Sequence, residues 1–529
     1  MDRKISHRIM LLFPAALTAV FFVFMYMYSG SLVDSDDAGE LILSELMSRE
    51  HGIMSVNWYY STEIRFLNSQ VIFAPLFYIF KSWRLVRSVG STLLVIIYEL
   101  CAYALGRSSG LSKEKSILLS GLVVLPLSGA YFHYVMFGSY YIPHIAISFG
   151  VITLINIYRD RGNVPAGVLS LCGAAFLSFA ACVEGPRQIL CLVAPLLVSA
   201  MILRERRLSF ASALCLLLSG AGYLTNKALA SVYTFSHFDN SITLSFSLEN
   251  LKTVIKSYLT SYGFRTDRSL LSPFVICDLA ALAIIVLTVI SVVRLIKKRR
   301  EIHPGAQLIL TFFLSAICVY TLFICLTGFS NSSRYNMQIT IYSLPLILLC
   351  LEDIRKGDDI SEGSDKISPG FIRAGKPLLY SAAALTALCG AMTYAEYIPD
   401  RVPAEHILIA KAIEDSGCSY AYSTFWNGNV LTELSDGRIE VHVWPYLIKG
   451  GADAGIEDPD SVFPSLQMKA HGTDHPSGPV CCVFDEKEKN SLFAESLKES
   501  EIIYHSDSRT VYKLPSYEEM AKLIRSGKP

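Results

Sequence analysis

The sequence IMLLFPAALTAVFFVFMYMYSGSLVDSDDAGELILSEL, residues 9–46, joins a long apolar run directly to a cluster of acidic residues. Residues 9–30 are almost unbroken in apolar character and are long enough to cross a bilayer as one helix. No small-residue cleavage site precedes the acids, so we expect this run to remain as a membrane span instead of being removed as a signal peptide. The chain is thus expected to leave a membrane and at once present four carboxylates, those of Asp34, Asp36, Asp37 and Glu40.

The composition of the whole chain also indicates a membrane protein. Hydrophobic residues make up 52% of the 529 positions and charged residues 17%, and the mean hydropathy of +0.41 is well above that of a soluble domain. The formal net charge is zero, so no bulk basicity indicates nucleic acid as a partner. The 13 cysteines form no CxxC pair and lie mostly in apolar segments, which indicates neither a zinc site nor a disulfide framework.

Apolar runs long enough to span a membrane occur at about 11 places along the chain. They cover residues 8–29, 86–106, 115–132, 142–158, 166–183, 188–203, 208–228, 273–293, 306–327, 338–351 and 377–396. A further apolar segment, 69–80, is at the short limit for a span and is equally compatible with a helix that lies in the membrane interface.

The distribution of basic residues resolves the role of segment 69–80. If this segment does not cross, all the basic clusters fall on one side of the membrane, which the positive-inside rule assigns to the cytoplasm. These clusters begin at Arg3, Arg107, Arg159, Arg204 and Arg294. We therefore expect segment 69–80 to be interfacial, the N-terminus to be cytoplasmic, and the acidic cluster to face outward.

The odd number of spans sends the C-terminal region to the outer side as well. Residues 1–396 are expected to form an all-α polytopic membrane domain, with a first outer loop over 30–84 and a second over 229–272. From about residue 397 the pattern changes, and residues 397–529 are expected to form a small extracytoplasmic α/β domain. Its expected elements are helix 403–415, strands 418–423, 438–444 and 479–484, helix 488–499, and two short strands within 501–513.

The acidic cluster admits two interpretations. Ser35 or Asp34 can cap a helix that starts near Asp36, and carboxylates in a first helical turn are stabilised by the unpaired amides and the helix dipole. This accounts for one or two of the acids, but four carboxylates beside a bilayer raise one another's pKa and are costly to desolvate. A carboxylate with a raised pKa is suited to take a proton from an attacking hydroxyl, or to hold a cation that neutralises a phosphate.

Aromatic and charged residues follow in the same outer loop. The segment NWYYSTEIR, residues 57–65, places Trp58 and Tyr59 close to Glu63 and Arg65. Flat apolar faces beside hydrogen-bonding groups suit a sugar ring or an isoprenoid phosphate. The alternative is an aromatic belt at the membrane interface, which would need no ligand.

Two arginines lie at the outer ends of expected spans, where positive charge is under-represented. They are Arg187 in EGPRQ and Arg334 in SSRYNMQ. A lipid-linked phosphate is a natural anion for such guanidinium groups. Pairing with a nearby acid such as Glu184, or with lipid headgroups, is the alternative.

These residues resemble the GT-C superfamily of integral-membrane glycosyltransferases, which includes protein mannosyltransferases and bacterial aminoarabinose transferases. Members have a short cytoplasmic N-terminus, one span and a large first outer loop that opens with an acidic pair, a pattern that here runs from Asp34 to about Pro75. NWYYSTEIRFLNSQVIFAP is similar to the next part of that loop and matches Glu63 and Arg65. SSRYNMQITIYSLPL looks like the later Arg-Tyr before a span. The sequence departs from the family in having DSDD for the usual Asp-Glu and in lacking a Lys-Pro-Pro.

The resemblance implies a bacterial plasma-membrane enzyme that transfers a sugar, with inversion, from a polyprenyl-phosphate donor to an envelope glycan, lipid or protein. Carried over, Asp36 takes the position of the catalytic base, with Asp34 and Asp37 as near competitors. The substrate-binding residues would be Glu40, Trp58, Tyr59, Glu63, Arg65, Arg187, Arg334 and Tyr335. No cofactor is specified; a divalent metal could bridge an acid and the phosphate, but no histidine cluster in the sequence indicates one.

Two other classes of function stay open at this stage. A transporter or lipid flippase would also place polar groups at span ends, but it predicts ionisable residues deep within several spans, and Glu99 is the clearest example in this sequence. A non-catalytic envelope assembly protein would use the acids only as helix caps and would depend outright on its C-terminal domain. For an enzyme, loss of that domain should mainly alter the choice of acceptor.

Overall fold

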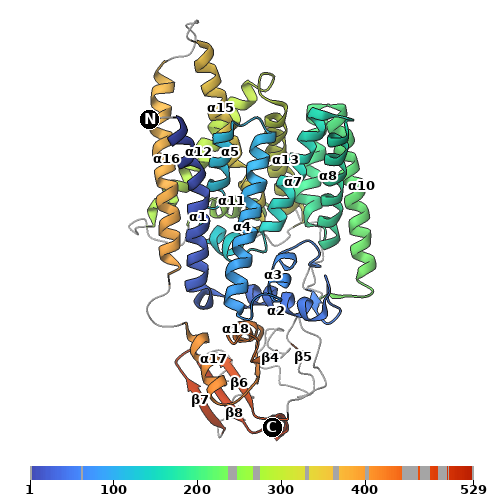
Figure 1. The fold of residues 1–529 in the computed structure, drawn as a ribbon, viewed down its shortest axis with the longest axis vertical. Helices are drawn as coiled ribbons and strands as arrows, with labels where there is room; N and C mark the ends of the chain where they lie inside the picture. The colour runs from blue at the N-terminus through green and yellow to red at the C-terminus, as the bar shows by residue number, and fades with distance from the viewer. Residues whose placement is uncertain are drawn as a thin grey trace.

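The structure, a computed structural model, consists of a long helical bundle with a smaller domain at one end (Figure 1). It describes residues 3–60, 63–235, 247–265, 274–327, 333–361, 369–398, 404–443, 463–464, 477–485, 497 and 500–526. Within these residues, 8 helical segments are long and apolar enough to cross a membrane. They lie in α1 (Arg3–Leu32), α4 (Trp83–Ser108), α7 (Ile142–Arg161), α8 (Pro165–Glu184), α10 (Arg206–Leu229), α12 (Val275–Lys297), α13 (Pro304–Thr327) and the consecutive α14 (Ser333–Thr340) and α15 (Ser343–Ser361). The polytopic helical domain expected from the sequence is confirmed.

Two of the expected spans are interrupted. The one expected over 115–132 is interrupted, because α5 (Lys113–Leu122) ends before Pro126, which has no amide hydrogen to continue a helix. After it come the short α6 (Gly129–Tyr131) and a π-helix, η1 (Phe132–Phe137). The run over 188–203 is divided between a second π-helix, η2 (Ile189–Val193), and α9 (Ala194–Leu203). The run expected over 377–396 lies within one long helix, α16 (Pro369–Glu396), which packs along α12.

The segment expected to be the first outer loop forms a layer between the bundle and the C-terminal domain (Figure 1). Helix α2 (Ser35–Glu50) begins immediately after α1 and packs against α3 (Gln70–Leu76). Seven residues of helix rise only about 10 Å, so α3 is too short to cross a bilayer, which favours the interfacial interpretation of 69–80. The strand β1 (Tyr59–Tyr60) pairs in parallel with β2 (Thr234–Phe235) and so joins this loop to the second one, which also contains α11 (Leu248–Ser261).

The basic loops gather at the opposite end of the bundle. Lys115 pairs with Glu352 at 3.0 Å, and Arg159 pairs with Glu205 at 2.5 Å. Arg159 Nη1 also donates to the carbonyl oxygen of Pro304 at 3.1 Å. These contacts hold together the ends of α5, α7, α10, α13 and α15, far from α2 (Figure 1). The separation of basic loops from the acidic cluster agrees with the expected topology, and the assignment of the basic side to the cytoplasm stays a prediction.

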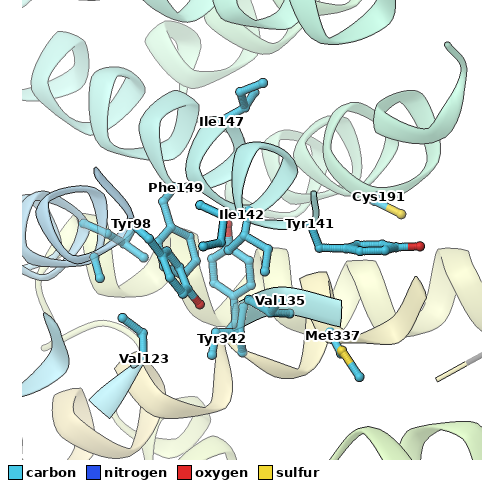
Figure 2. Close-up of a cluster of buried hydrophobic side chains, with 14 of the residues drawn as sticks. Tyr98, Val123, Val135, Tyr141, Ile142, Ile147, Phe149, Cys191, Met337 and Tyr342 are labelled. Carbon is cyan, nitrogen blue, oxygen red and sulfur yellow. The ribbon is translucent and has the colours of Figure 1, made fainter. Parts of the chain in front are cut away.

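Buried aromatic residues hold the centre of the bundle together. The rings of Phe149 and Tyr342 pack edge to face with centroids 5.1 Å apart, and Figure 2 shows them beside Tyr98. The hydroxyl of Tyr342 hydrogen-bonds Ser148 at 2.7 Å, and that of Tyr98 hydrogen-bonds Tyr131 at 3.0 Å. Since the phenol groups have partners, this core can combine large apolar area with satisfied polar tips, and it supports the neighbouring segment that carries Tyr141 (Figure 2).

The C-terminal domain is built on a mixed 6-stranded sheet in the order β5-β4-β3-β6-β8-β7. The strands are β3 (Tyr420–Ser423), β4 (Glu440–Val443), β5 (Phe463–Pro464), β6 (Val480–Asp485), β7 (Glu501–His505) and β8 (Arg509–Leu514). β3 is parallel to β4 and β6, and the other pairs are antiparallel. The central strand β6 reads VCCVFD and is buried on both faces, as expected for a strand covered from two sides.

Helices cover both faces of this sheet. Helices α17 (Glu405–Asp415) and α18 (Phe425–Leu434) contribute to the core on one face, and α20 (Tyr517–Ser526) contributes to the core on the other. The α/β character expected from the sequence is confirmed, but α18 and α20 were not expected. The expected helix 488–499 falls outside the residues that the structure describes, apart from Leu497.

Candidate active site

The acidic cluster occupies the first turn of α2. Asp34 is the N-cap, and its carboxylate accepts a hydrogen bond from the amide of Asp37 at 2.9 Å, as the capping interpretation expected. Its other oxygen lies 3.3 Å from His133 Nε2. Burial opposes ionisation of Asp34, but the hydrogen bonds from His133 and from the Asp37 amide outweigh it and lower the pKa of this carboxyl. Capping therefore explains one acid, and the remaining three need separate explanations.

Asp36, the second residue of α2, is half-buried. Burial, and then the negative charge of Asp34, raises the pKa of its carboxyl group, while the positive charge of Arg334 acts in the opposite direction. The structure thus brings the acidic turn and Arg334 into each other's electrostatic range, although about 300 residues separate them along the chain. Asp36 and Arg334 are both among the site residues predicted from the sequence.

Asp37 is fully buried. Neither of its carboxyl oxygens has a hydrogen-bond partner among the described residues, and the backbone of Gly138 approaches so closely that an added Cβ there would lie 2.5 Å from Asp37 Oδ1. Burial, followed by the charge of Asp34, raises the pKa of Asp37 well above its usual value. Asp34, Asp37 and His133 each offer a ligand atom, and these atoms lie within 4.8 Å of one another.

The next acids along the loop form a buried network with two arginines. Arg65 Nη2 donates to Glu40 at 2.7 Å and its Nη1 donates to Glu63 at 3.3 Å. Arg187 Nε reaches the other oxygen of Glu63 at 2.9 Å. Burial opposes ionisation of Glu63, but Arg187 and His144 outweigh it and hold the pKa of Glu63 well below its usual range. All four predicted residues are therefore brought together, and Arg187 pairs with Glu63, whereas Glu184 was the partner weighed from the sequence.

Behind this network lie residues that sequence reasoning left out of the site. His144 is buried between Glu63 at 3.7 Å and Glu184 at 3.8 Å. Glu184 in turn accepts from the amide of Leu67 at 2.8 Å, so it holds the loop that carries Arg65. Histidines near span ends are commonly interfacial, and nothing in their local sequence marks His133 or His144 as partners of acids in a distant loop.

Arg334 is placed among aromatic rings. Its guanidinium lies over the rings of Tyr335 at 5.1 Å and Tyr134 at 5.8 Å, and its Nη2 donates to Tyr335 at 3.2 Å. The guanidinium of Arg187 lies 5.4 Å from the centre of the same Tyr335 ring. Among the described residues no carboxylate forms a salt bridge with Arg334, and its buried Nε has no hydrogen-bond partner there.

Trp58 and Tyr59 have a different setting from the charged residues. Trp58 is buried in the core of the bundle, and Tyr59 lies in β1, paired with Thr234 of β2. The neighbouring Tyr60 packs edge to face on Tyr233 at 5.9 Å. These contacts join the two outer loops, and the binding of a sugar by Trp58 or Tyr59 stays a prediction.

The C-terminal domain reaches the acidic turn directly. Ser35 Oγ donates to the carbonyl oxygen of Phe425 at 2.5 Å, and Asn429 Nδ2 donates to the carbonyl oxygen of Ser35 at 3.1 Å. Arg87 at the start of α4 pairs with Glu433 and donates to the carbonyl oxygen of Asp37 at 2.8 Å. The first turn of α2 is therefore held between the bundle and α18.

Comparison with known proteins identifies the fold. No protein-family model matches the chain, and no curated protein sequence matches it. Among solved structures, apo ArnT from Cupriavidus metallidurans superposes with a TM-score of 0.60 at 14% identity, covering 95% of this chain and 97% of that chain. ArnT bound to undecaprenyl phosphate gives 0.58 with the same identity and coverage. AglB, an oligosaccharyltransferase from Archaeoglobus fulgidus, is more distant: its TM-score is 0.49 at 10% identity, covering 91% and 70%.

The likeness to ArnT extends over nearly the whole of both chains. It therefore includes the helical domain as well as the C-terminal α/β domain. The chain has the fold of ArnT, and this confirms the fold class that the sequence resemblance implied. At this level of identity, function has to be argued from the site.

Proposed function

We propose that this chain is a membrane glycosyltransferase that moves a sugar from a polyprenyl-phosphate donor to an acceptor on the side of the membrane where α2 lies. The observation that carries the proposal lies at one end of an ArnT-like bundle. There Arg334 acts on Asp36 of the acidic turn, and the ring of Tyr335 links Arg334 to Arg187. ArnT itself has been solved bound to undecaprenyl phosphate. Acid and guanidinium groups at one bilayer surface suit a donor that is both anionic and lipid-anchored.

Asp36 is the proposed base because it is the acid of the first turn that is neither the helix cap nor fully buried. It would accept the proton of the acceptor hydroxyl. The hydroxyl oxygen then forms the new glycosidic bond at the anomeric carbon, from the face opposite the phosphate. The bond between that carbon and the phosphate oxygen breaks, and its electron pair stays on the polyprenyl phosphate, so the sugar is inverted and no protonated leaving group is required.

The arginines divide into two groups by their partners. Arg65 and Arg187 are matched by Glu40 and Glu63, so their charge is largely balanced within the protein. Arg334 contacts aromatic rings and the phenol of Tyr335. It is therefore the first candidate to bind the donor phosphate and to stabilise the charge that develops as the phosphate leaves. Tyr335 contacts both Arg334 and Arg187 and would fix the positions of their guanidinium groups relative to each other.

A divalent metal fits the donor set of Asp34, Asp37 and His133. A fully buried carboxyl group without a hydrogen bond, as in Asp37, is costly to ionise unless a cation meets it. Two carboxylates and one imidazole, with ligand atoms within 4.8 Å of one another, offer such a place. Such a metal would supply positive charge close to the donor phosphate. Asp34 at the helix cap, Asp37 in the first turn of α2 and His133 in η1 would hold the metal.

The proposal is tested by a transfer assay on purified full-length protein reconstituted in lipid nanodiscs. Undecaprenyl-phosphate sugars are offered with glycan, lipid and peptide acceptors in turn, and release of undecaprenyl phosphate is followed by mass spectrometry, with and without a chelator. We expect release that depends on an acceptor. If a folded protein leaves every donor intact, even with a whole envelope extract as acceptor, the proposal is wrong.

A further inference from the structure

The contact between α18 and α2 determines where the acidic turn sits. Two hydrogen bonds with α18 fix the first residue of α2. The hydroxyl of Ser35 donates to the carbonyl oxygen of Phe425, and the carbonyl oxygen of Ser35 accepts from Asn429. Figure 1 shows α18 directly against the layer that contains α2. The residue next to the cap of the acidic helix is thus bound by a domain that begins about 370 residues later in the chain.

A buried ion pair continues this contact. Arg87 is 1% exposed and Glu433 is 7% exposed; Arg87 Nε and Nη2 bond the two carboxylate oxygens, the second at 2.6 Å. A two-point pair of this kind fixes the plane of the guanidinium. The fixed group then directs Nη2 to the carbonyl oxygen of Asp37 at 2.8 Å. Glu433 therefore acts on the backbone of the acidic turn through Arg87.

The domain also binds the start of α4, which carries Arg87. The amide of Trp83 donates to Asp436 Oδ1 at 2.8 Å. Gly437, with φ of 76°, lies so close to Trp83 that an added Cβ would be 2.9 Å from its ring. Helices α4 and α2 are both held by α18 and the turn after it. The position of the acidic helix is therefore fixed relative to the C-terminal domain.

We infer that the C-terminal domain positions the acidic turn of α2, and that Glu433 is a positioning residue that acts through Arg87. The clamp, meaning Arg87, Glu433, Ser35 and Asn429, fixes the backbone from which Asp34, Asp36 and Asp37 project. Its consequence for catalysis rests on the proposed function. Loss of the clamp should lower kcat by about 10- to 100-fold, because misplacing a catalytic group costs rate. The donor KM should change less than kcat, because Arg334, the first candidate to bind the donor phosphate, lies on α14 and not on α2.

The test that needs no enzymatic activity is hydrogen–deuterium exchange on the purified full-length protein. In Glu433→Gln, the amides of residues 36–42 should exchange about tenfold faster than in the wild type, while those of β6 in the same domain stay protected. The matched control is Glu414→Gln, which breaks the exposed pair with Arg438 in the same domain and should leave α2 unchanged. Unaltered exchange of α2 in Glu433→Gln would overturn the inference.

A second variant separates positioning from folding. Replacing both partners, Arg87→Met with Glu433→Met, leaves no unpaired buried charge, so the thermal midpoint should stay near that of the wild type. The hydrogen bond to Asp37 is still lost, so fast exchange of α2 and low kcat should persist. If this double variant exchanges and turns over like the wild type, the clamp has no positioning role. If α2 loosens in a chain whose wild type transfers no sugar, the clamp stands and the proposed function fails.

Discussion

Asp36 and Asp37 are neighbours in the chain, yet their carboxyl groups have different surroundings. Asp37 is fully buried against Gly138, whereas Asp36 is half-buried and interacts electrostatically with Arg334. A base has to reach the acceptor hydroxyl in order to take its proton. Asp36 can meet this requirement, and Asp37 is better placed to hold a cation or to stay protonated.

Substituting the base should remove transfer without unfolding the protein. In Asp36→Asn the side chain keeps its shape but cannot accept a proton, so we expect transfer to fall by at least about 10³-fold. The thermal midpoint should be unchanged. Glu45→Gln is the matched control, since it removes a carboxylate two turns later on the same helix; it should keep full activity. Full transfer by Asp36→Asn would remove the base assignment.

Arg334 should affect both donor binding and turnover. Arg334→Gln removes the guanidinium charge that acts on Asp36, so we expect a higher donor KM and a kcat lower by about 100-fold. Arg334→Lys should be intermediate, since lysine keeps the charge but not the planar contact with Tyr335. Arg49→Gln, at an exposed pair on α2, serves as the control. The measurements are steady-state kinetics with a soluble acceptor and the thermal midpoint of each variant. If Arg334→Gln lowered only the thermal midpoint and left KM and kcat unchanged, the role of Arg334 would be purely structural.

Glu63 should contribute to stability in a pH-dependent way. Its pKa is lowered in the folded state by Arg187 and His144, against the effect of burial. The stabilisation is therefore complete above the unfolded pKa of about 4.5 and is lost as the pH falls below that value. Glu63→Gln leaves Arg187 without its buried partner, so we expect a loss of about 3 kcal/mol at neutral pH.

The measurement for Glu63 is the thermal midpoint across pH 3 to 7 for the wild type and Glu63→Gln. The two curves should approach each other as the pH falls. Glu249→Gln, from the exposed pair with Lys252, should follow the wild type throughout. A constant difference between Glu63→Gln and the wild type at every pH would show that ionisation of Glu63 does not stabilise the fold.

At the scale of elements, local signals were predictable and breaks in helices were not. The cap at Asp34 follows from a side chain that bonds the amide three residues ahead, so the sequence contains the whole interaction. The end of α5 has a local signal in Pro126, which a search for apolar runs passes over. The π-helices η1 and η2 lie in segments that are as apolar as an ordinary helix, so composition does not distinguish them. Helix α18 was missed because its main packing partner is α2, which lies about 390 residues earlier in the chain.

The turn after η1 gives an element-scale prediction. A methyl group at Gly138 would lie 2.5 Å from both Asp37 Oδ1 and the Tyr140 ring, so Gly138→Ala must displace one of them. We expect transfer to fall by about tenfold or more, with a lower thermal midpoint. Gly220→Ala on α10 is the matched control, since nothing lies within 4 Å of the added atom, and it should be neutral or stabilising. Equal behaviour of the two variants would show that Asp37 tolerates movement.

At the scale of the whole molecule, charge distribution predicted the layout and distance in sequence concealed the site. Basic loops and acids were assigned to opposite ends from composition alone, because the rule concerns segments and not contacts. The pairing of Arg87 with Glu433 joins residues 346 positions apart, and the pairing of Glu63 with Arg187 joins residues 124 positions apart. Neither pair has a local signature. Because the C-terminal domain docks on the acidic turn, deleting this domain should lower the rate of transfer and also alter the choice of acceptor.

The most direct test of the account is a structure of the protein with undecaprenyl phosphate bound in nanodiscs. We expect the phosphate to lie within hydrogen-bonding distance of Arg334, on the side that faces Asp36, with the lipid tail leaving between helices of the bundle. Arg334→Gln, prepared in parallel, should lose the phosphate density. A phosphate bound at the end of the bundle that carries Arg159 and Arg207, or density unchanged in Arg334→Gln, would contradict the account.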